Sequence, residues 1–255
     1  MFNAVTGFAQ ITGNQTVVVD HYNNCLRTVH PRTGVTTPYA GRCTERGDAD
    51  GRLLGEALLD HPWAIGSYGG RLYVTDSGNH ALRLITGGRV STIIKDPSAL
   101  PNPQGLTFAD GFAFITSHSQ GLVRLDLLTK SVTILTNGTG PAGSLSAAQL
   151  FFPRGLTFLS PSILLIANNG KHQLLLANIR NNTVTEICDG TRATTDGDIR
   201  SCKLDYPASV LMVNQCVYVG QDGAIRRLPV AALSEFIPSM ETTAAAPGEN
   251  TLIIF

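Results

Sequence analysis

Four histidines stand between short apolar runs and could, by residue type, ligate a metal ion. They are His21, His80, His118 and His172. Imidazole nitrogens bind zinc and copper readily, so four rings that converged on one point would form a metal centre. Their offsets from the neighbouring apolar runs differ, however, so the rings would not point at one spot. We therefore expect these histidines to belong to local turns, and we predict no metal site and no cofactor.

Two segments rich in aspartate and glycine resemble calcium-binding loops. One contains Asp48, Asp50 and Gly51, and the other contains Asp196, Gly197 and Asp198. If Gly51 held the sixth position of an EF-hand loop, Arg46 would fill the first position and Ala57 the twelfth, and neither residue can ligate calcium. The sequence therefore excludes an EF-hand, and Asp-Gly pairs are common in polar turns. A looser calcium contact stays open as an alternative.

Arginine recurs in the same part of several segments, where a row of guanidinium groups could form an anion-binding face. The residues are Arg27, Arg83, Arg124 and Arg226. We favour a structural duty, such as capping carbonyl groups, because the recurrence follows the repeated structure. The sequence has no Gly-x-Ser-x-Gly turn, no phosphate-binding glycine loop and no recognisable pair of carboxylates. We therefore expect no catalytic residues.

The charge balance argues against two classes of partner. Charged residues make up 15% of the 255-residue chain, with nineteen basic and nineteen acidic side chains. A balanced chain has no global field that attracts nucleic acid or an anionic membrane. No apolar run approaches the ~18 residues of a membrane span. We predict no nucleic-acid partner and no membrane span.

These residues lie in a pattern that recurs five times at a period of about 40 to 55 residues, which indicates stacked copies of one unit. Each copy has an apolar run, a short polar turn and a second apolar run. In the fourth copy the pattern predicts four strands, over 155–159, 163–167, 173–177 and 183–187. Sheets of this kind bury both faces against their neighbours. The fold class predicted is therefore all-β, a β-propeller of four-stranded antiparallel blades.

Glycine- and aspartate-rich links join the copies, and the second copy carries a specific line of residues, Leu-Tyr-Val-Thr-Asp-Ser-Gly-Asn-His-Ala-Leu-Arg-Leu-Ile over 72–85. Together these features resemble the NHL-repeat family over residues 8 to 230. The resemblance implies a propeller, commonly of six blades. Asp76 and Asn79 of this line are replaced by Ser117 and Gln120 in the third copy, and by Asn168 and Lys171 in the fourth. We therefore expect some blades to use a different turn.

The resemblance also implies two alternatives to a simple binding role. A copper- and zinc-dependent lyase shares the NHL fold, so a metal-dependent propeller enzyme of lyase or hydrolase type is the first alternative. The predicted innermost strands here, at 64–65, 106–108, 156–158 and 210–212, have almost no carboxylates or histidines, which argues against it. An RNA-binding NHL domain is the second alternative, and the balanced charge disfavours it.

The number of blades stays open between five and six. Equivalent strands lie near residues 18, 73, 114, 165 and 218, so one blade takes about fifty residues. We assign 1–235 to one propeller domain and 236–255 to a C-terminal tail, which is a linker or a ring-closing strand. Either Met1–Val5 or Leu252–Phe255 could provide the closing strand.

The five cysteines have no CxxC spacing that would suggest zinc. In the propeller, Cys25 begins a third strand and Cys43 lies in the following link, whereas Cys188 ends a fourth strand and Cys202 lies in the next link. We predict these two pairs as disulfides and Cys216 as a free thiol at the opposite face. Each bridge closes a loop of about fifteen to twenty residues, worth roughly 3 kcal/mol in the chain-entropy model. Five reduced thiols in a cytosolic protein are the alternative.

Three Asn-x-Ser/Thr sequons, at Asn14, Asn137 and Asn181, fall in predicted turns or links where glycans are tolerated. With the predicted disulfides, they favour an extracellular or cell-surface setting. The first residues lack the pattern of a secretory signal, and the chain ends in an apolar stretch. We therefore expect a segment of a longer precursor.

These observations favour a non-enzymatic recognition or adhesion module that binds a protein or a glycan. Long links of mixed charge over 41–61 and 188–206 stand on a rigid repeat frame, and binding residues concentrate on loops of this kind. The predicted binding residues are Arg46, Asp48, Asp50, Arg192, Asp196 and Asp198. Because loop residues are exposed, we expect charge reversal at Arg46, Asp50, Arg192 or Asp198 to leave folding intact.

Overall fold

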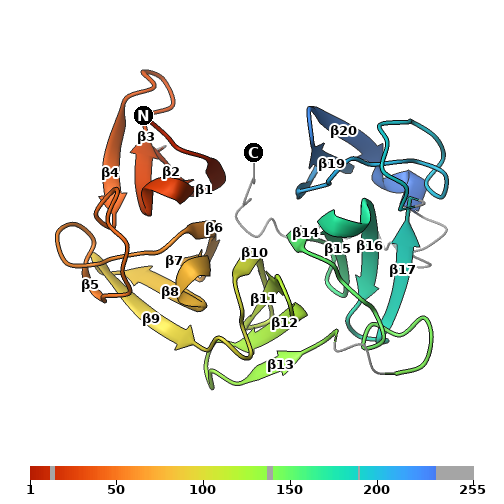
Figure 1. Ribbon diagram of the computed structural model, residues 1–255, viewed down its shortest axis with the longest axis horizontal. Coiled ribbons are helices and arrows are strands. Elements are labelled where there is room, and N and C mark those ends of the chain that lie inside the picture. Colours follow the sequence, from red (N-terminus) through yellow and green to blue (C-terminus); the bar gives the residue numbers. More distant parts are fainter. Residues whose placement is uncertain (12–14, 137–139, 189, 234–255) are drawn as a thin grey trace.

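A computed structural model describes residues 1–11, 15–136, 140–188 and 190–233. These residues form five antiparallel sheets, the blades of a propeller, arranged around a common axis (Figure 1). The all-β propeller predicted from the sequence is confirmed, with five blades. No helix among the described residues has both the length and the apolar character needed to cross a membrane.

Within each blade the strands pair in chain order. Blade 1 contains β1 (Val5–Ile11), β2 (Gln15–Asp20), β3 (Cys25–Val29) and β4 (Thr36–Ala40). Blade 2 contains β6 (Pro62–Tyr68), β7 (Arg71–Asp76), β8 (Ala81–Thr86) and β9 (Arg89–Lys95), with the short β5 (Gly51–Arg52) paired to β9. Blade 3 contains β10 (Pro103–Ala109), β11 (Phe112–Ser117), β12 (Gly121–Asp126) and β13 (Val132–Ile134).

The last two blades follow the same order. Blade 4 contains β14 (Pro153–Ser160), β15 (Ile163–Asn168), β16 (Gln173–Asn178) and β17 (Thr183–Ile187). These bounds agree closely with the four strands predicted from the fourth sequence copy. In blade 5 the described strands are β18 (Ser209–Val213), β19 (Cys216–Gln221) and β20 (Ala224–Pro229), and the short 3-10 turn η4 (Val230–Leu233) follows them.

Two-residue glycine turns produce the hairpins of blade 2. Gly87 and Gly88 join β8 to β9 with φ values of 55° and 73°. Both residues therefore lie in the left-handed region, which the type I′ hairpin turn requires and which glycine adopts without steric cost. The hairpin between β6 and β7 has the same geometry, because Gly69 and Gly70 in its turn also have positive φ values.

Apolar side chains fill the space between consecutive blades. Blades 2, 3 and 4 each have apolar residues on both faces of the sheet, so each packs against the blade before it and the blade after it. Between blades 1 and 2, for example, Val17, Val19 and Leu26 pack with Ile65 and Val74. Similar clusters join blades 2 and 3, blades 3 and 4, and blades 4 and 5. Burying one Val, Ile or Leu side chain stabilises a fold by about 1.5–3 kcal/mol, so these clusters hold the blades in a fixed order.

The inner strands β1, β6, β10, β14 and β18 pack against one another in succession. Within the described residues no such packing joins β18 to β1, and Figure 1 shows the first and fifth blades standing apart. Val5 pairs with Asp20 inside blade 1, so Met1–Val5 does not close the ring as we had considered. Residues 236–255, which include the other candidate, Leu252–Phe255, lie outside the described part of the chain.

Candidate binding face

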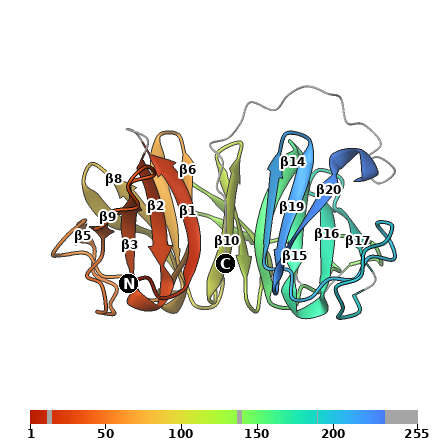
Figure 2. The ribbon, with the colours of Figure 1, turned by 90° about the horizontal axis from the view of Figure 1, so that it is seen from above.

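Two kinds of connection meet at one end of the blades. One is the turn between the second and third strands, and the other is the link from an outer strand to the inner strand of the next blade. In blades 1, 2 and 4 the turns are the 3-10 turns η1 (His21–Asn23), η2 (Ser77–Asn79) and η3 (Asn169–Lys171). We call this end the link face and the opposite end, with the other hairpins, the hairpin face. Figure 2 shows the strands running between the two ends.

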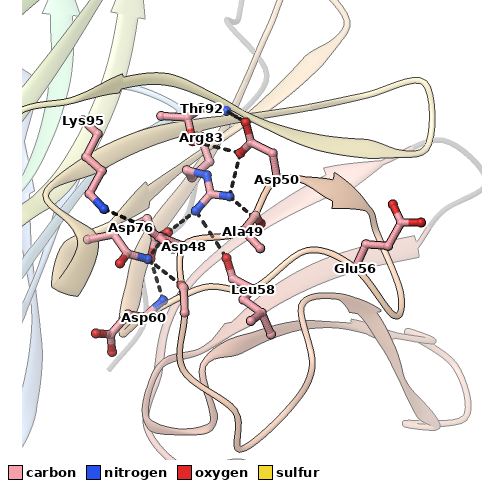
Figure 3. A network of polar contacts seen from close by, with 12 residues as sticks. Asp48, Ala49, Asp50, Glu56, Leu58, Asp60, Asp76, Arg83, Thr92 and Lys95 are labelled. Carbon is pink, nitrogen blue, oxygen red and sulfur yellow. Dashed lines mark hydrogen bonds and ion pairs between the residues drawn. The ribbon is translucent and has the colours of Figure 1, made fainter.

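A buried aspartate–arginine pair organises the link face of blade 2 (Figure 3). The Asp76 carboxylate accepts hydrogen bonds from Arg83 at 2.7 Å, from the Asn79 amide at 2.8 Å and from the backbone N–H of Asp60 at 2.8 Å. Asp76 is 0% exposed and Arg83 is 1% exposed. Burial raises the pKa of Asp76 to about 6, against the effect of its hydrogen bonds and of the Arg83 charge. The pair ties the turn to the preceding link.

The same arrangement is present in blade 1 and is modified in the next two blades. Asp20 accepts from Asn23 and from Arg27, whose Nε lies 2.7 Å away. Blade 3 has no 3-10 turn, as expected from Ser117. Blade 4, in contrast, retains the 3-10 turn η3. The Asn168 amide oxygen accepts the backbone N–H of Phe151 at 2.7 Å, so the asparagine replaces the aspartate in holding the link.

The recurring arginines of strands β3 and β8 are therefore structural, as predicted. Arg83 also donates to the backbone oxygens of Leu58 and Ala49, at 3.3 and 3.0 Å. In blade 3, Arg124 lies over the Phe112 ring, 4.9 Å from its centre. None of these contacts requires a ligand.

A side-chain acceptor, either a histidine ring or an asparagine amide, connects the turns of blades 1, 2 and 4 to the next blade. His80 and His172 take a left-handed conformation and accept, through Nδ1, the backbone N–H of Asn102 at 3.0 Å and of Tyr206 at 3.2 Å. Asn24 does the same for His61 at 2.9 Å. His80 and His172 thus have a structural role in the repeat. No group of three or more His, Cys, Asp or Glu side chains suited to a metal ion occurs among the described residues.

Two disulfides fasten links to the link face, with the predicted pairing. Cys25 bonds to Cys43 with a Cα–Cα distance of 5.0 Å, and Cys188 bonds to Cys202 with a Cα–Cα distance of 4.6 Å. Cys216 is free and buried at the start of β19, towards the hairpin face. Its Sγ accepts a hydrogen bond from Nε of Arg227 at 3.2 Å.

The first link positions three of the predicted binding residues, and they differ in their surroundings. Arg46 is 64% exposed and lies 3.7 Å from an oxygen of Asp60. Asp48 is 60% exposed and pairs with Lys95 at 2.6 Å. Asp50 instead accepts from Arg83 at 2.9 Å and from both the backbone and the side chain of Thr92.

These contacts give Asp50 a part in the fold. Burial opposes ionisation of its carboxyl, but the hydrogen bonds from Thr92 and the charge of Arg83 prevail and lower the pKa of Asp50.

The last link positions the other three predicted residues at the opposite side of the link face. Arg192 pairs with Asp205 at 2.8 Å and covers the ring of Tyr206, 4.9 Å from its centre. Asp196 is almost fully exposed and pairs with Arg226 at 2.5 Å. Asp198 accepts backbone N–H groups of its own turn, which lowers its pKa. Within the described residues no contact joins this set to the set of the first link.

The predicted glycosylation sites lie only partly in the described chain. Asn181 is exposed in the turn between β16 and β17, on the hairpin face. Asn14 and Asn137 lie outside the described residues.

Exposed aromatic side chains collect on the link face. Tyr22 is 55% exposed, Phe151 53%, Tyr206 40% and Phe152 37%. Tyr22 belongs to η1, and the other three residues end the links that lead into blades 4 and 5. Tyr218, the remaining exposed aromatic residue among those described, lies in the middle of β19. Aromatic residues of this kind are enriched at protein interfaces.

Side chains of three blades also meet near the axis at the link face. The Arg154 guanidinium of β14 lies over the Trp63 ring of β6, 5.2 Å from its centre. Because blade 3 separates these two blades, the side chains meet across the centre of the ring. The Trp63 ring also contacts His21 of blade 1, with ring centres 4.8 Å apart, and His21 lies 5.1 Å from His61 and 4.5 Å from Tyr22. We call these five residues the axial cluster.

The cluster carries one constant positive charge, and its buried histidine resists protonation. His21 Nδ1 lies 3.0 Å from the carbonyl oxygen of Pro62, to which the neutral ring donates. Burial lowers the pKa of His21, and the nearby charges of His61 and Arg154 add to this effect. Burial and the Arg154 charge also lower the pKa of His118, whose ring packs at a tilt against Phe152.

Our sequence reasoning did not identify the axial cluster. Its strand residues directly follow the prolines that begin the inner strands, as Trp63 follows Pro62 and Arg154 follows Pro153. Gln104 has the same position in blade 3. An aligned comparison of the residues after each link proline would have placed these three side chains at one level of the ring.

The comparisons with known proteins agree on the fold and on little else. No family model matches the sequence. No curated protein matches it either. The resemblance to NHL repeats therefore stays a prediction.

Several solved structures share the propeller. An auxiliary nutrient binding protein from Bacteroides thetaiotaomicron is 15% identical with a TM-score of 0.69, covering 89% of this chain and 59% of that chain. A chain of a nidogen/laminin complex is 16% identical with a TM-score of 0.64, covering 89% of this chain and 76% of that one. Virginiamycin B lyase from Staphylococcus aureus is 16% identical with a TM-score of 0.59, covering 89% and 66%. At these identities the likeness shows the propeller fold alone.

Proposed function

We propose that the protein is a non-enzymatic recognition module that binds a protein or glycan partner through its link face. The observation that carries this proposal is the gathering of Tyr22, Phe151, Phe152 and Tyr206, all exposed, on this one end of the blades. Large aromatic side chains on a rigid frame lose little conformational entropy on binding, and they are frequent among the residues that dominate binding energy.

The links add charged residues around this aromatic surface. Arg46 and Asp48 in the first link and Arg192, Asp196 and Asp198 in the last stand outward, and the two disulfides restrain both links. Charges at the rim of an interface guide association and specificity. Disulfides are typical of oxidising compartments, so an extracellular or cell-surface location supports the same role. Similar propellers in a nidogen/laminin complex and in a nutrient binding protein are in line with it.

The test is a binding screen of the immobilised chain against arrays of glycans and of secreted proteins, followed by variants. Tyr206→Ser and Arg192→Glu should each weaken the partner found, while the melting temperature stays unchanged. Lys130→Glu and Arg180→Glu are matched controls on the hairpin face, where both residues are exposed. The proposal is wrong if the hairpin-face variants abolish binding and the link-face variants do not.

A further inference from the structure

We propose that the axial cluster binds a carboxylate-bearing sugar residue of a glycan, such as a uronic acid. This inference rests on the proposed function and names the ligand class for its centre. It follows from three observations: the positive charge of the cluster, its aromatic surfaces, and a buried amide oxygen at the equivalent position of the inner strand of blade 3.

The charge comes from Arg154. Its backbone oxygen accepts a hydrogen bond from the hydroxyl of Thr116, which fixes the start of β14, and its guanidinium lies over the Trp63 ring. The N–H donors of a guanidinium lie in its plane and match the two oxygens of a carboxylate. Burial lowers the pKa of Arg154, so an anion beside the group would restore the favourable environment that burial removes.

The amide oxygen belongs to Gln104. This residue is 8% exposed and occupies in blade 3 the position that Trp63 and Arg154 occupy in blades 2 and 4. Its Oε1 atom is buried and has no hydrogen-bond partner among the described residues. Buried polar atoms without a partner are rare in native proteins and call for an explanation. A ligand hydroxyl would supply the missing donor.

The aromatic surface is contributed by Trp63 and by the half-exposed Tyr22. Tyr22 lies near enough to Arg154 to raise the pKa of its guanidinium, so the aromatic and cationic groups border the same space. A sugar acid offers a carboxylate, hydroxyl donors and an apolar ring face in one rigid unit, which binds with less loss of freedom than a flexible acidic side chain. This favours the sugar over an acidic peptide.

The experiment compares two probes that differ only in the carboxylate. Methyl glucuronide and methyl glucoside are titrated into the chain by calorimetry, with the ring signals of His21 and His118 followed by NMR. We expect glucuronide to bind at least about tenfold more tightly, equivalent to about 1.4 kcal/mol, and to shift both histidine signals. Equal binding of the two sugars, or no binding of glucuronide, overturns the inference.

Variants locate the site. Arg154→Gln should abolish the preference for glucuronide, and Arg154→Lys should keep part of it. Arg124→Gln is the matched control, because Arg124 also stacks on an aromatic ring but lies outside the cluster. The melting temperature of each variant checks folding. Unchanged preference in a folded Arg154→Gln protein overturns the inference.

Two further arms separate related ideas. A capped aspartate peptide that binds as tightly as the glucuronide, and equally depends on Arg154, would assign the cluster to an acidic protein segment and overturn the sugar. A third outcome separates this inference from the proposed function. If Tyr206→Ser weakens binding of a partner found on the arrays, while Arg154→Gln changes neither that binding nor the binding of glucuronide, the link-face function holds and the axial inference fails.

Discussion

The Nδ1 atom of His80 accepts the backbone N–H of Asn102, 3.0 Å away at the entrance to the next blade. Asn102 precedes a proline and has a φ of 45°, an uncommon conformation for a residue other than glycine. His61 and Tyr206 have the same conformation before their prolines, and Asn24 and His172 accept their N–H groups. An imidazole or amide acceptor on the turns of blades 1, 2 and 4 thus stabilises the strained entrance to the following inner strand.

Replacing the acceptor should therefore matter more than replacing the ring. We expect His80→Ala to lower the free energy of unfolding by about 1–2 kcal/mol, because the N–H of Asn102 loses its partner. His80→Asn should cost much less, since asparagine tolerates the left-handed conformation and performs this role at position 24. Denaturant unfolding of the two variants measures the difference, and equal losses would contradict the assignment.

The buried ion pair of blade 2 predicts a large effect from one substitution. Arg83→Met should lower the free energy of unfolding by about 3–5 kcal/mol, because the Asp76 carboxylate is left buried without its cation. Arg27→Met is the matched control in blade 1, where the arginine is 18% exposed and a smaller loss is expected. Thermal and denaturant unfolding give both values. Equal losses would show that burial does not set the cost.

The disulfides should stabilise the two longest described links. Replacing Cys25 and Cys43 by serine, or Cys188 and Cys202, should lower the free energy of unfolding by roughly 3 kcal/mol per pair in the chain-entropy model. Cys216→Ser should change it far less, since that thiol bonds to no other cysteine. A peptide map under non-reducing conditions checks the pairing, and any bridge that includes Cys216 would refute it.

His21 predicts a dependence of stability on pH. Its pKa is lowered in the fold, so below the unfolded value of 6.5 the unfolded chain holds more protons than the folded one. The contribution of His21 is therefore complete above that value and declines as the pH falls through it.

The free energy of unfolding should thus fall more steeply from pH 7 to pH 5 in the native chain than in His21→Gln. The raised pKa of Asp76 acts in the opposite direction over this range, so the difference between the two slopes is the quantity to measure. His30→Gln, at an exposed histidine, serves as the control. Parallel slopes for the native chain and His21→Gln would contradict the prediction.

The first link should respond unequally to charge reversal. Asp50→Lys should destabilise the fold, because it removes the acceptor of Arg83 and Thr92 and places a cation beside the buried arginine. Arg46→Glu should stay within about 0.5 kcal/mol of the native chain, as is usual for exposed positions. Our sequence-based expectation that both reversals leave folding intact therefore changes for Asp50. Melting temperatures distinguish the two cases.

The amino-acid sequence by itself determined the repeated unit, its strands and its covalent ties. Alternating apolar residues and glycine turns act over a few positions, so the four strands of blade 4 could be predicted almost to the residue. The pairing of Cys25 with Cys43 and of Cys188 with Cys202 followed because each pair is near in sequence and on the same end of one repeat.

Only the tertiary structure decided which side chains of different blades meet. Arg154 contacts Trp63 from a blade two positions away, and no local pattern encodes the position of the axis. Asp50 looked like an exposed loop charge, but its role depends on Arg83, which the chain brings to it from 33 residues away. The separation of β1 from β18 likewise depends on the angle between blades, which the packing of whole sheets sets and a strand pattern does not reveal.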